Sequence, residues 1–299
     1  MQTAETFERY RPLLFGIAYR MLGSAMEAED AVQETYLRYQ ATPPESVRSE
    51  RAFLSTVITR LCIDQLRSAR AQREQYVGPW LPEPLLTEDL AAAPTPADRI
   101  GERESISMAF LVLLERLTPL ERAVFLLHEV FDYSFAEVGE IVGRTEVTCR
   151  QLFRRAKQHL VEQRPRFAPS PVEQQRLTES FLRACRHGDL DELTGLLAED
   201  VTLWADGGGK VAAARQPIHG RAAVARFLLG ILAKAPADLG VQPTEINGEP
   251  GIVAYSGGRA FGALAIETDG QQVRGLRLVA NPDKLEGLQG TGASAMPWR

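Results

Sequence analysis

The chain has 299 residues, of which 44% are hydrophobic and 24% are charged, and its formal net charge is −5 at pH 7. This length suffices for about two domains with cores of their own, and the composition is that of a globular protein, which excludes a disordered chain. No apolar run approaches the roughly 18 residues of a membrane span, and the N-terminal residues do not resemble a signal peptide, so neither a membrane protein nor a secreted one is expected.

The three cysteines, Cys62, Cys149 and Cys185, are far apart and lie in helix-like segments. An odd number of scattered cysteines argues against a disulfide framework and against a clustered zinc site. It favours the reducing cytoplasm as the location of the protein. We expect no metal and no cofactor.

The negative net charge hides a local pattern of opposite sign. Residues 144–159 carry five arginines and lysines against one acid, and residues 60–73 carry four arginines against one aspartate. Residues 26–50 have the reverse balance, with six acids against two arginines. Because salt limits the reach of each charge to about 10 Å, the two basic segments can still bind phosphate groups on an acidic chain.

Three helices are predicted in residues 5–75. Apolar residues recur at helical spacing from Phe7 to Met21, and Gly23-Ser24 ends this first helix. The second helix runs from about residue 25 to residue 39, and its acidic start suits the positive end of the helix dipole; Pro43-Pro44 ends it.

The third helix, from about residue 50 to residue 73, is amphipathic. Its apolar stripe comprises Phe53, Leu54, Val57, Ile58, Leu61 and Cys62. Its opposite side carries Thr56, Thr59, Arg60, Arg67 and Arg70.

Residues 76–104 contain five prolines, which interrupt any helix, and they are predicted to form an extended linker. The segment Trp80–Leu85 within it is too apolar for an idle linker. It is either a loop pinned to its own domain or a docking segment for another surface.

Residues 105–165 return to a helical pattern. Helix Ser134–Val142, the turn Gly143-Arg144 and helix Thr145–Leu160 have the form of a helix-turn-helix motif. Thr145 is a good N-cap for the second of these helices. The polar face of that helix carries Thr148, Arg150, Gln151, Arg154, Arg155, Lys157 and Gln158. Such a face can be merely solvated, but the glycine turn and the Gln and Arg residues near the helix start favour reading of DNA bases.

The pattern changes again after Pro165, and an α+β domain is predicted. Helices are expected over about 172–187, 189–197 and 221–232, and strands over about 201–204, 241–246, 251–255, 261–267 and 273–279. Asp269-Gly270 is a predicted hairpin turn. The Gly/Ala/Ser-rich tail from Gly287 is expected to be disordered.

Three blocks of sequence in this order resemble the extracytoplasmic-function (ECF) group of bacterial sigma factors. They are Glu29–Arg38, Cys62–Arg67 and Leu117–Arg122 ahead of the helix-turn-helix. The C-terminal part resembles a SnoaL-like domain, a cone-shaped sheet wrapped by helices. The segments Trp80–Leu85, Asp206–Val211 and Asn281–Leu285 are similar to motifs of the SigJ-type subgroup, in which such a domain is fused to the sigma factor.

The resemblance implies a multidomain fold with two all-α sigma modules and a C-terminal α+β cone-shaped domain. The expected boundaries are 1–75 for sigma region 2, 76–104 for the linker, 105–168 for sigma region 4, 169–285 for the SnoaL-like domain and 286–299 for the tail.

The resemblance also implies partners, namely core RNA polymerase and promoter DNA, and no membrane. Region 2 would bind core polymerase through Asp30, Gln33, Glu34 and Arg38, and would bind the −10 element through Arg60, Asp64, Arg67 and Arg70. Region 4 would bind the −35 element through Thr148, Arg150, Gln151, Arg154, Arg155 and Lys157. An acidic helix suits a basic partner, and arginine and glutamine suit guanine and adenine edges.

The C-terminal domain is expected to regulate the sigma factor by docking on the linker. The residues implied in this contact are Trp80, Leu81, Pro82, Asp206, Gly207, Gly208, Asn281, Pro282, Asp283, Lys284 and Leu285.

Two other functions remain open. One is a helix-turn-helix regulator that binds DNA without polymerase. The other is a SnoaL-like enzyme fused to a DNA-binding module, with Asp206 and His219 as a general acid/base pair; we expect no catalytic residue, and an unidentified small ligand of this domain is left open. The run Asp206–Val211 lacks the spacing of a P-loop, so its glycines are expected to permit close approach of two backbones.

Overall fold

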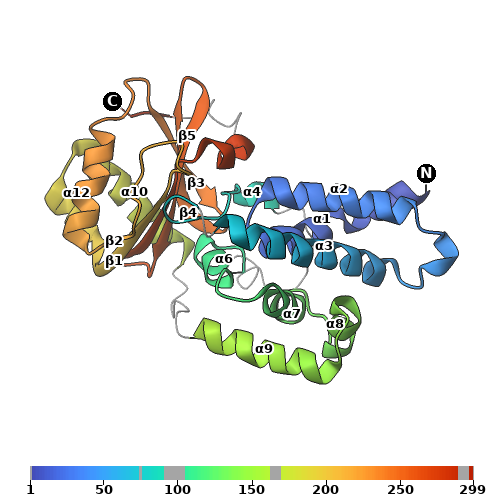
Figure 1. Cartoon of the computed structure of the whole chain (residues 1–299). Helices are drawn as coiled ribbons and strands as arrows, with labels where there is room; N and C mark the ends of the chain where they lie inside the picture. The colour runs from blue at the N-terminus through green and yellow to red at the C-terminus, as the bar shows by residue number, and fades with distance from the viewer. Residues whose placement is uncertain (1, 74–75, 91–104, 162–169, 289–295, 299) are drawn as a thin grey trace. The chain divides into compact units, whose positions relative to one another are not determined.

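The structure is a computed structural model that describes all residues except 1, 74–75, 91–104, 162–169, 289–295 and 299. It divides into two compact units, each described by itself below (Figure 1). Unit 1 comprises Met1–Gln75, Ala91–Ile106 and Phe110–Arg164. Unit 2 comprises Tyr76–Leu90, Ser107–Ala109 and Pro165–Arg299.

The N-terminal half of unit 1 consists of the three predicted helices, α1 (Gln2–Leu22), α2 (Ala25–Gln40) and α3 (Glu50–Arg73). Ser24 begins α2, because its side chain accepts a hydrogen bond from the Glu27 N–H. The helices pack through apolar stripes whose buried members include Leu14, Ile17, Val32, Leu54, Ile58 and Cys62.

The second half of unit 1 contains most of α6 (Met108–Leu114), then α7 (Pro119–Glu129), α8 (Phe135–Val142) and α9 (Glu146–Val161). Thr118 and Ser134 begin α7 and α8 with capping boxes. Gly143 ends α8 in the left-handed region with a φ of 67°, as the glycine turn of a helix-turn-helix requires. A Cβ on Gly139 would lie 2.7 Å from the Arg144 oxygen, so the turn packs closely on α8.

The two predicted helical domains form one compact unit rather than two. Helix α7 contacts α1 and α3 as well as α9, and Figure 1 shows it between α3 and α9. Arg122 of α7 is buried and donates to the Met21 oxygen at 2.6 Å and to the Leu114 oxygen at 3.0 Å. The sequence did not indicate this packing, because it depends on residues about a hundred positions apart.

Unit 2 is built on a seven-stranded sheet in the order β2-β1-β6-β5-β4-β3-β7. Its strands are β1 (Leu197–Asp206), β2 (Ile218–His219), β3 (Gly240–Ile246), β4 (Glu249–Ser256), β5 (Arg259–Thr268), β6 (Val273–Val279) and β7 (Met296–Pro297). Strands β3 to β6 form the predicted antiparallel meander. Strand β1 pairs with β6 in parallel, which places Asp206 opposite Val279.

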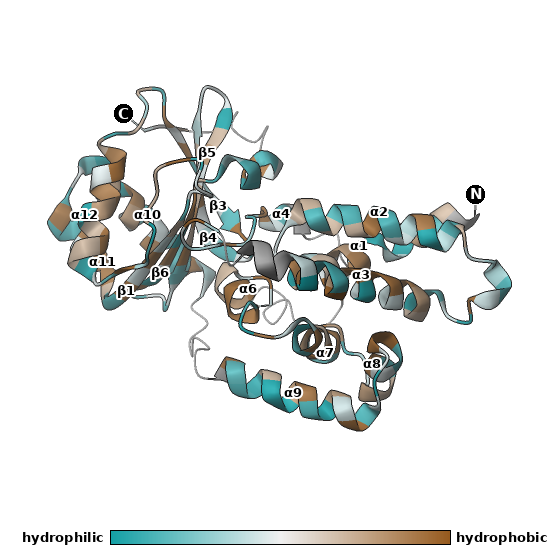
Figure 2. Ribbon diagram, in the orientation of Figure 1, coloured by the Kyte–Doolittle hydropathy of each residue, from teal (hydrophilic) through white to brown (hydrophobic). Residues whose placement is uncertain are grey.

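One face of this sheet is covered by α10 (Pro171–His187), α11 (Leu190–Leu196) and α12 (Arg221–Leu232). Figure 2 shows hydrophobic residues concentrated in the sheet where α10 and α12 lie over it. The core between them includes Phe181, Leu193, Val201, Leu203, Val224, Leu228, Ile266 and Leu276. This layered arrangement of helices and sheet agrees with the predicted α+β class.

The described residues beyond Leu285 differ from the disordered tail that we expected, whereas residues 289–295 and 299 of that tail lie outside the described residues. Glu286–Leu288 forms a 3-10 turn, and Met296 and Pro297 pair with the edge of β3. The Trp298 N–H donates to the Leu239 oxygen at 2.8 Å, and the indole enters the core of unit 2. A large apolar ring at the end of a polar, glycine-rich segment was the overlooked signal, because its burial offsets the cost of ordering the chain.

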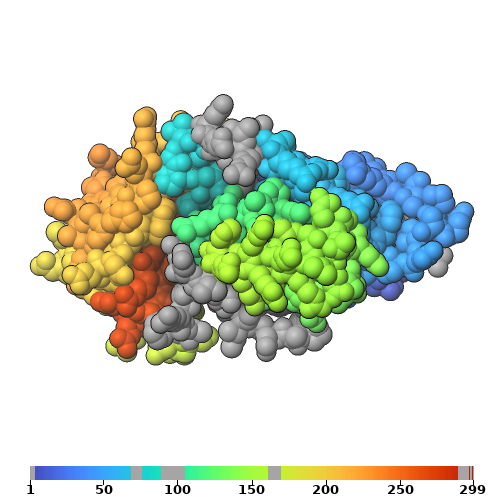
Figure 3. All heavy atoms as spheres, turned by 60° about the horizontal axis from the view of Figure 1, so that its bottom comes forward, coloured from blue at the N-terminus to red at the C-terminus, as the bar shows by residue number. Residues whose placement is uncertain are grey.

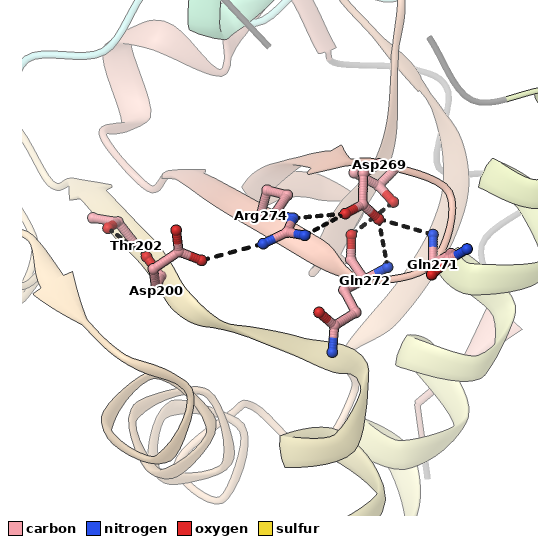
Figure 4. Close-up of polar contacts among 7 residues, drawn as sticks. Asp200, Thr202, Asp269, Gln271, Gln272 and Arg274 are labelled. Carbon is pink, nitrogen blue, oxygen red and sulfur yellow. Dashed lines mark hydrogen bonds and ion pairs between the residues drawn. The ribbon is translucent and has the colours of Figure 1, made fainter. Parts of the chain in front are cut away.

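The predicted hairpin turn at Asp269-Gly270 joins β5 to β6 (Figure 4). The Asp269 carboxylate accepts hydrogen bonds from the N–H groups of Gln271 and Gln272 at 2.9 and 2.8 Å. Arg274 bridges this carboxylate to Asp200 of β1. These contacts fix the turn and the pairing of β1 with β6, so the network has a structural role.

Within the described residues, no helix is long and apolar enough to span a membrane. The three cysteines are free and buried. In the same part of the chain, no group of His, Cys, Asp and Glu side chains is arranged to hold a metal ion.

Candidate functional site

Helix α2 presents one exposed face outside the packing of α1 and α3. Of the residues predicted to bind polymerase, Asp30, Gln33 and Arg38 are exposed and Glu34 is half-buried. Arg38 donates to Glu34 at 2.7 Å, so this pair is internally neutralised. The same face exposes two large apolar side chains that the sequence did not single out, namely Met26 (61% exposed) and Leu37 (59% exposed).

Helix α3 carries the arginines predicted to meet the −10 element. Arg67 is exposed and pairs with Asp64 at 3.1 Å. The Arg70 side chain lies outside the described residues. Arg60 points at the helix-turn-helix, where it donates to the main-chain oxygens of Ile141 at 3.1 Å and Glu140 at 3.4 Å. Arg60 therefore acts on the C-terminal end of α8, where a cation is favoured by the free carbonyl groups.

Other residues on the polar side of α3 contact the segment between α7 and α8. Ser55 Oγ and Tyr133 Oη lie 2.7 Å apart, and Arg51 donates to Tyr133 Oη at 3.2 Å. Thr59, which the sequence places opposite the apolar stripe of α3, is fully buried. It is buried because α7 and α8 contact α3 within unit 1.

Helix α9 holds the residues predicted to read the −35 element. Thr148 is half-buried and bonds to the N-cap Thr145 at 2.8 Å between the two hydroxyl oxygens. Figure 2 shows α9 as largely hydrophilic, and Figure 3 shows it exposed on the face turned toward the viewer (light green). The members of the predicted set that are exposed are Arg150, Gln151, Arg154, Arg155 and Lys157.

These exposed residues of α9 fall into two kinds. Arg150 pairs with Glu146 and lies over the Phe135 ring, and Lys157 pairs with Glu129 at 3.1 Å. Gln151, Arg154 and Arg155 form no hydrogen bond or ion pair with the residues that the structure describes. The second kind is available to DNA without breaking an internal contact.

The apolar linker segment belongs to unit 2. Residues Leu81–Leu86 are buried and Trp80 is half-buried, and the helix α4 (Thr87–Leu90) follows. Of the two interpretations left open, a loop pinned to its own domain and a docking segment for another surface, the contacts favour the second, because the segment bonds to the sheet domain.

The first of these contacts is centred on Asp206, which lies fully buried at the end of β1. Its carboxylate accepts hydrogen bonds from Tyr76 Oη at 2.6 Å and from the Leu81 N–H at 2.9 Å. The Lys284 ammonium lies 2.8 Å from the same carboxylate and also donates to the Leu81 oxygen at 2.5 Å. Both main-chain polar groups of Leu81 are thus held by one buried ion pair.

Aromatic rings and an amide complete this arrangement. The Lys284 ammonium lies 4.3 Å from the centre of the Trp80 ring and 5.0 Å from that of Tyr76, distances at which a cation is attracted to the ring face. Asn281 donates to Tyr76 Oη at 3.1 Å. Burial and the Asp206 carboxylate raise the pKa of the Tyr76 phenol. We call the set Tyr76, Trp80, Leu81, Asp206, Asn281 and Lys284 the linker clamp.

The remaining residues predicted for this contact surround the clamp. Asp283 pairs with Lys210 at 2.5 Å on the surface, Pro282 is exposed, and Pro82 and Leu285 are buried. A Cβ on Gly207 would lie 2.5 Å from the Val211 oxygen, and one on Gly208 would overlap the Asn281 amide. The glycines therefore permit close approach, as the sequence predicted.

A second contact, which the sequence analysis missed, holds the other end of the linker segment. Asn247 is buried in the turn between β3 and β4; its side chain accepts from the Leu85 N–H at 3.0 Å, and its N–H donates to the Leu85 oxygen at 2.9 Å. Leu86 forms a β-bridge with Ile246. Asn247-Gly248 between two alternating segments was the available signal, because Asn-Gly is the preferred dipeptide of a tight hairpin.

Asp206 and His219 are not brought together. His219 pairs with Thr202 across β1 and β2, and four residues along a strand put Asp206 roughly 13 Å further on. The Asp206 carboxylate is occupied by the clamp, while His219 is exposed and bonds to Thr202 at 3.1 Å. The arrangement gives no general acid/base pair from these two residues.

Comparison with known proteins places these sites in a family. Residues 6–72 match the model of Sigma-70 region 2, residues 107–160 match Sigma-70 region 4, and residues 178–279 match the SnoaL-like domain. The chain is 38% identical over 298 residues to the ECF RNA polymerase sigma factor SigJ of Mycobacterium tuberculosis, covering 96% of this chain and 94% of that one. The chain is an ECF sigma factor.

Other relatives agree with this assignment. The probable ECF RNA polymerase sigma factor SigI of M. tuberculosis is 30% identical over 282 residues, covering 94% of this chain and 93% of that one. The crystal structure of M. tuberculosis SigJ superposes with a TM-score of 0.75 at 34% identity, covering 95% of this chain and 98% of that one. This ECF sigma factor is therefore a transcription initiation factor whose partners are RNA polymerase and promoter DNA, with a SnoaL-like domain at its C-terminus.

Proposed function

We propose that the SnoaL-like domain regulates this sigma factor without catalysis, by controlling how far region 2 and region 4 can separate. The observation that carries the proposal is the linker clamp, in which the buried Asp206–Lys284 pair holds both main-chain groups of Leu81. The clamp lies in the segment that joins the two DNA-binding regions, so any change in it changes the reach of the chain between them.

The length of the connecting segment makes this effect large. Thirty-four residues separate the end of α3 at Arg73 from the start of α6 at Met108, and a fully extended chain of that length spans at most about 110–120 Å. Tyr76–Thr87 is held on the sheet domain, and the 20 residues between Thr87 and Met108 span at most about 70 Å when fully extended. Promoter elements centred near −10 and −35 lie about 25 base pairs apart, roughly 85 Å along the duplex. The separation of the promoter elements therefore lies between the reach of the whole connecting segment and the reach of the part that the clamp leaves. The clamp can thus decide which promoter spacings the chain reaches.

Engagement of both elements also requires unit 1 to open. Arg60 donates to the end of α8, and Tyr133 bonds to Ser55 and Arg51 of α3. These contacts hold region 2 against region 4, whereas the two elements are about 85 Å apart on DNA. The compact form of unit 1 is thus the resting state, and binding to core polymerase and promoter separates its halves.

The surfaces that remain free in the resting state are assigned accordingly. The α2 face of Asp30, Gln33 and Leu37 binds core polymerase, because an exposed apolar side chain beside acidic and polar ones suits a basic protein partner. Gln151, Arg154 and Arg155 of α9 contact the −35 element. Arg60 and Arg67 contact the −10 region once the halves part, and the protein acts in the cytoplasm, where it meets core polymerase and DNA.

Run-off transcription with core RNA polymerase tests the regulatory proposal. Promoters are first found on fragmented genomic DNA of the source organism, and one is then rebuilt with spacers shortened and lengthened in single base-pair steps. Asp206→Asn and Leu81→Ala should widen the range of spacers transcribed at least half as well as the best one. Lys210→Met is the matched control, since it removes the exposed Lys210–Asp283 pair beside the clamp and leaves the linker contacts in place.

Small-angle scattering on the same variants supplies an independent measure of separation. The clamp variants should have a larger radius of gyration than the wild type and the control. An unchanged spacer profile together with an unchanged radius in folded clamp variants would show that the clamp does not regulate initiation.

A further inference from the structure

A second titratable cluster lies on the sheet of unit 2, apart from the linker clamp. Glu249 begins β4, and Glu267 and Arg277 belong to β5 and β6. In the antiparallel register Gly251 lies opposite Ala265, so Glu249 and Glu267, two residues further out on each strand, project from the same face. Ala265 lies opposite Arg277 in turn, which puts the guanidinium beside both carboxylates.

The Glu249 carboxylate faces the start of region 4. It accepts a hydrogen bond from the Met108 N–H at 3.0 Å, and the Ala109 N–H also faces it. Met108 is fully buried. Residues Ser107–Ala109 belong to the compact unit of the sheet, whereas α6 continues to Leu114 in the other unit. The first turn of α6 is therefore part of the SnoaL-like domain, and the rest of the helix is part of region 4.

With both carboxyl groups ionised, the cluster has two negative charges and one positive charge. Arg277 lies 2.8 Å from Glu267 through Nη2, and both side chains are largely buried. Its Nη1 atom is buried and has no hydrogen-bond partner among the described residues, while the Trp204 ring covers the guanidinium at 5.0 Å. Two half-buried carboxylates thus share one buried cation, and holding an uncompensated negative charge away from water is costly.

We propose that Glu249 is a positioning residue for region 4, which holds the first turn of α6 on the SnoaL-like domain and binds one proton while that turn is in place. Departure of the turn opens the carboxyl group to water, and the proton is released. The attachment of region 4 to this domain is then linked to pH. These contacts are separate from the linker clamp. Only an effect of this attachment on promoter choice would rest on the proposed function.

The direction of the linkage follows from the surroundings of Glu249. Burial, assisted by the negative charge of Glu267, raises the pKa of Glu249 from 4.5 to about 7, against the opposing effects of Arg277 and the N–H groups of Met108 and Ala109. A carboxyl group whose pKa is raised in the attached state favours that state at low pH. The attachment weakens as the pH rises from 4.5 to about 7 and then stays constant. Between pH 6 and pH 8 the attachment equilibrium should fall about tenfold.

Hydrogen exchange on the full-length protein measures this directly. The protection factors of amides 107–114, corrected for intrinsic exchange rates, are followed from pH 6 to pH 8 and referred to amides of α10. The wild type should lose about tenfold in protection over this range. Glu249→Gln, which keeps an acceptor oxygen but cannot titrate, should show protection that does not change with pH.

Two further variants make the result specific. Glu267→Gln removes the competing carboxylate, so the transition should move to lower pH, because Arg277 then serves Glu249 alone. Glu173→Gln is the matched control: Glu173 caps α10 at the surface and its hydrogen bonds to Ser170 lower its pKa, so it stays ionised throughout and its loss should leave the pH dependence of α6 unchanged.

A wild-type protein whose α6 protection is equal at pH 6 and pH 8 would overturn the proposal, whether or not the variants fold. So would a pH dependence that persists in Glu249→Gln. Failure of the clamp variants to alter transcription would overturn the proposed function and leave this measurement untouched.

Discussion

The guanidinium of Arg60 lies 3.1 Å from the main-chain oxygen of Ile141 and caps the helix that precedes the recognition helix. Arg60 thus joins region 2 to region 4 in the free protein, whereas under the proposed function the same side chain contacts promoter DNA. One side chain cannot serve both partners at the same time. The proposed function therefore requires release of Arg60 from α8 on the path from the free sigma factor to the promoter complex.

Tyr133→Phe should loosen the resting state. The variant removes a buried hydroxyl that bonds to Ser55 and Arg51, and it leaves the Ser55 hydroxyl without its partner, so unit 1 should lose about 1–2 kcal/mol of stability in denaturant titrations. Affinity for core polymerase should rise, because less energy is needed to part the two regions. The double variant Ser55→Ala/Tyr133→Phe is the control, since removal of both polar groups should cost less than the sum of the single changes; additive losses would contradict a direct bond.

Asp206→Asn should destabilise unit 2 more than the loss of one hydrogen bond would. The change leaves the Lys284 ammonium, which is 12% exposed, without its counter-charge. Breaking one side of a buried ion pair costs about 3–5 kcal/mol. The double variant Asp206→Asn/Lys284→Met removes both charges and should recover part of this loss. Thermal unfolding of the single variants and the double variant gives the coupling free energy between Asp206 and Lys284. Lys210→Met, which removes the exposed Lys210–Asp283 pair, is the comparison.

Trp298→Ala should destabilise the SnoaL-like domain although it lies one residue from the end of the chain. The indole is only 7% exposed, packs in the core and has the Arg186 guanidinium 5.7 Å from its ring centre. Replacing a buried tryptophan by alanine costs about 3–5 kcal/mol. Guanidinium denaturation followed by far-ultraviolet dichroism measures the loss, and a variant of the exposed Met296 should cost less than about 1 kcal/mol. Equal stability of Trp298→Ala and wild type would show that the terminal strand does not contribute to the core.

The three cysteines should resist alkylation in the native protein. Burial raises the pKa of the Cys185 thiol to about 12 and also raises those of Cys62 and Cys149, and the thiolate is the reactive form. At pH 8 iodoacetamide should modify none of the three within the time in which it modifies all of them in denaturant. Mass spectrometry of the intact protein gives the count, and rapid native modification at Cys62 would indicate that α3 separates easily from its neighbours.

The pattern of apolar residues along the chain was sufficient to predict the helices of both regions and the four-stranded meander, since helical and strand periodicity are local properties. Cap residues such as Ser134 and the left-handed Gly143 also act within a few positions of the helix ends that they fix. The residues of the helix-turn-helix could be placed for the same reason. Local rules could not place Thr59, whose exposure depends on helices far away in the sequence.

Sequence alone thus determined the elements, the order of the domains and the three motifs around Trp80, Asp206 and Asn281. Only the tertiary structure decided that these motifs meet, because β1 pairs with β6 and so brings Asp206 beside the chain that follows Val279. It likewise decided that Arg60 contacts α8, that Trp298 enters the core and that Glu249 accepts a hydrogen bond from Met108. The physical reason is that local propensities act over a few residues, whereas burial and the pairing of charges depend on which distant segments share a surface.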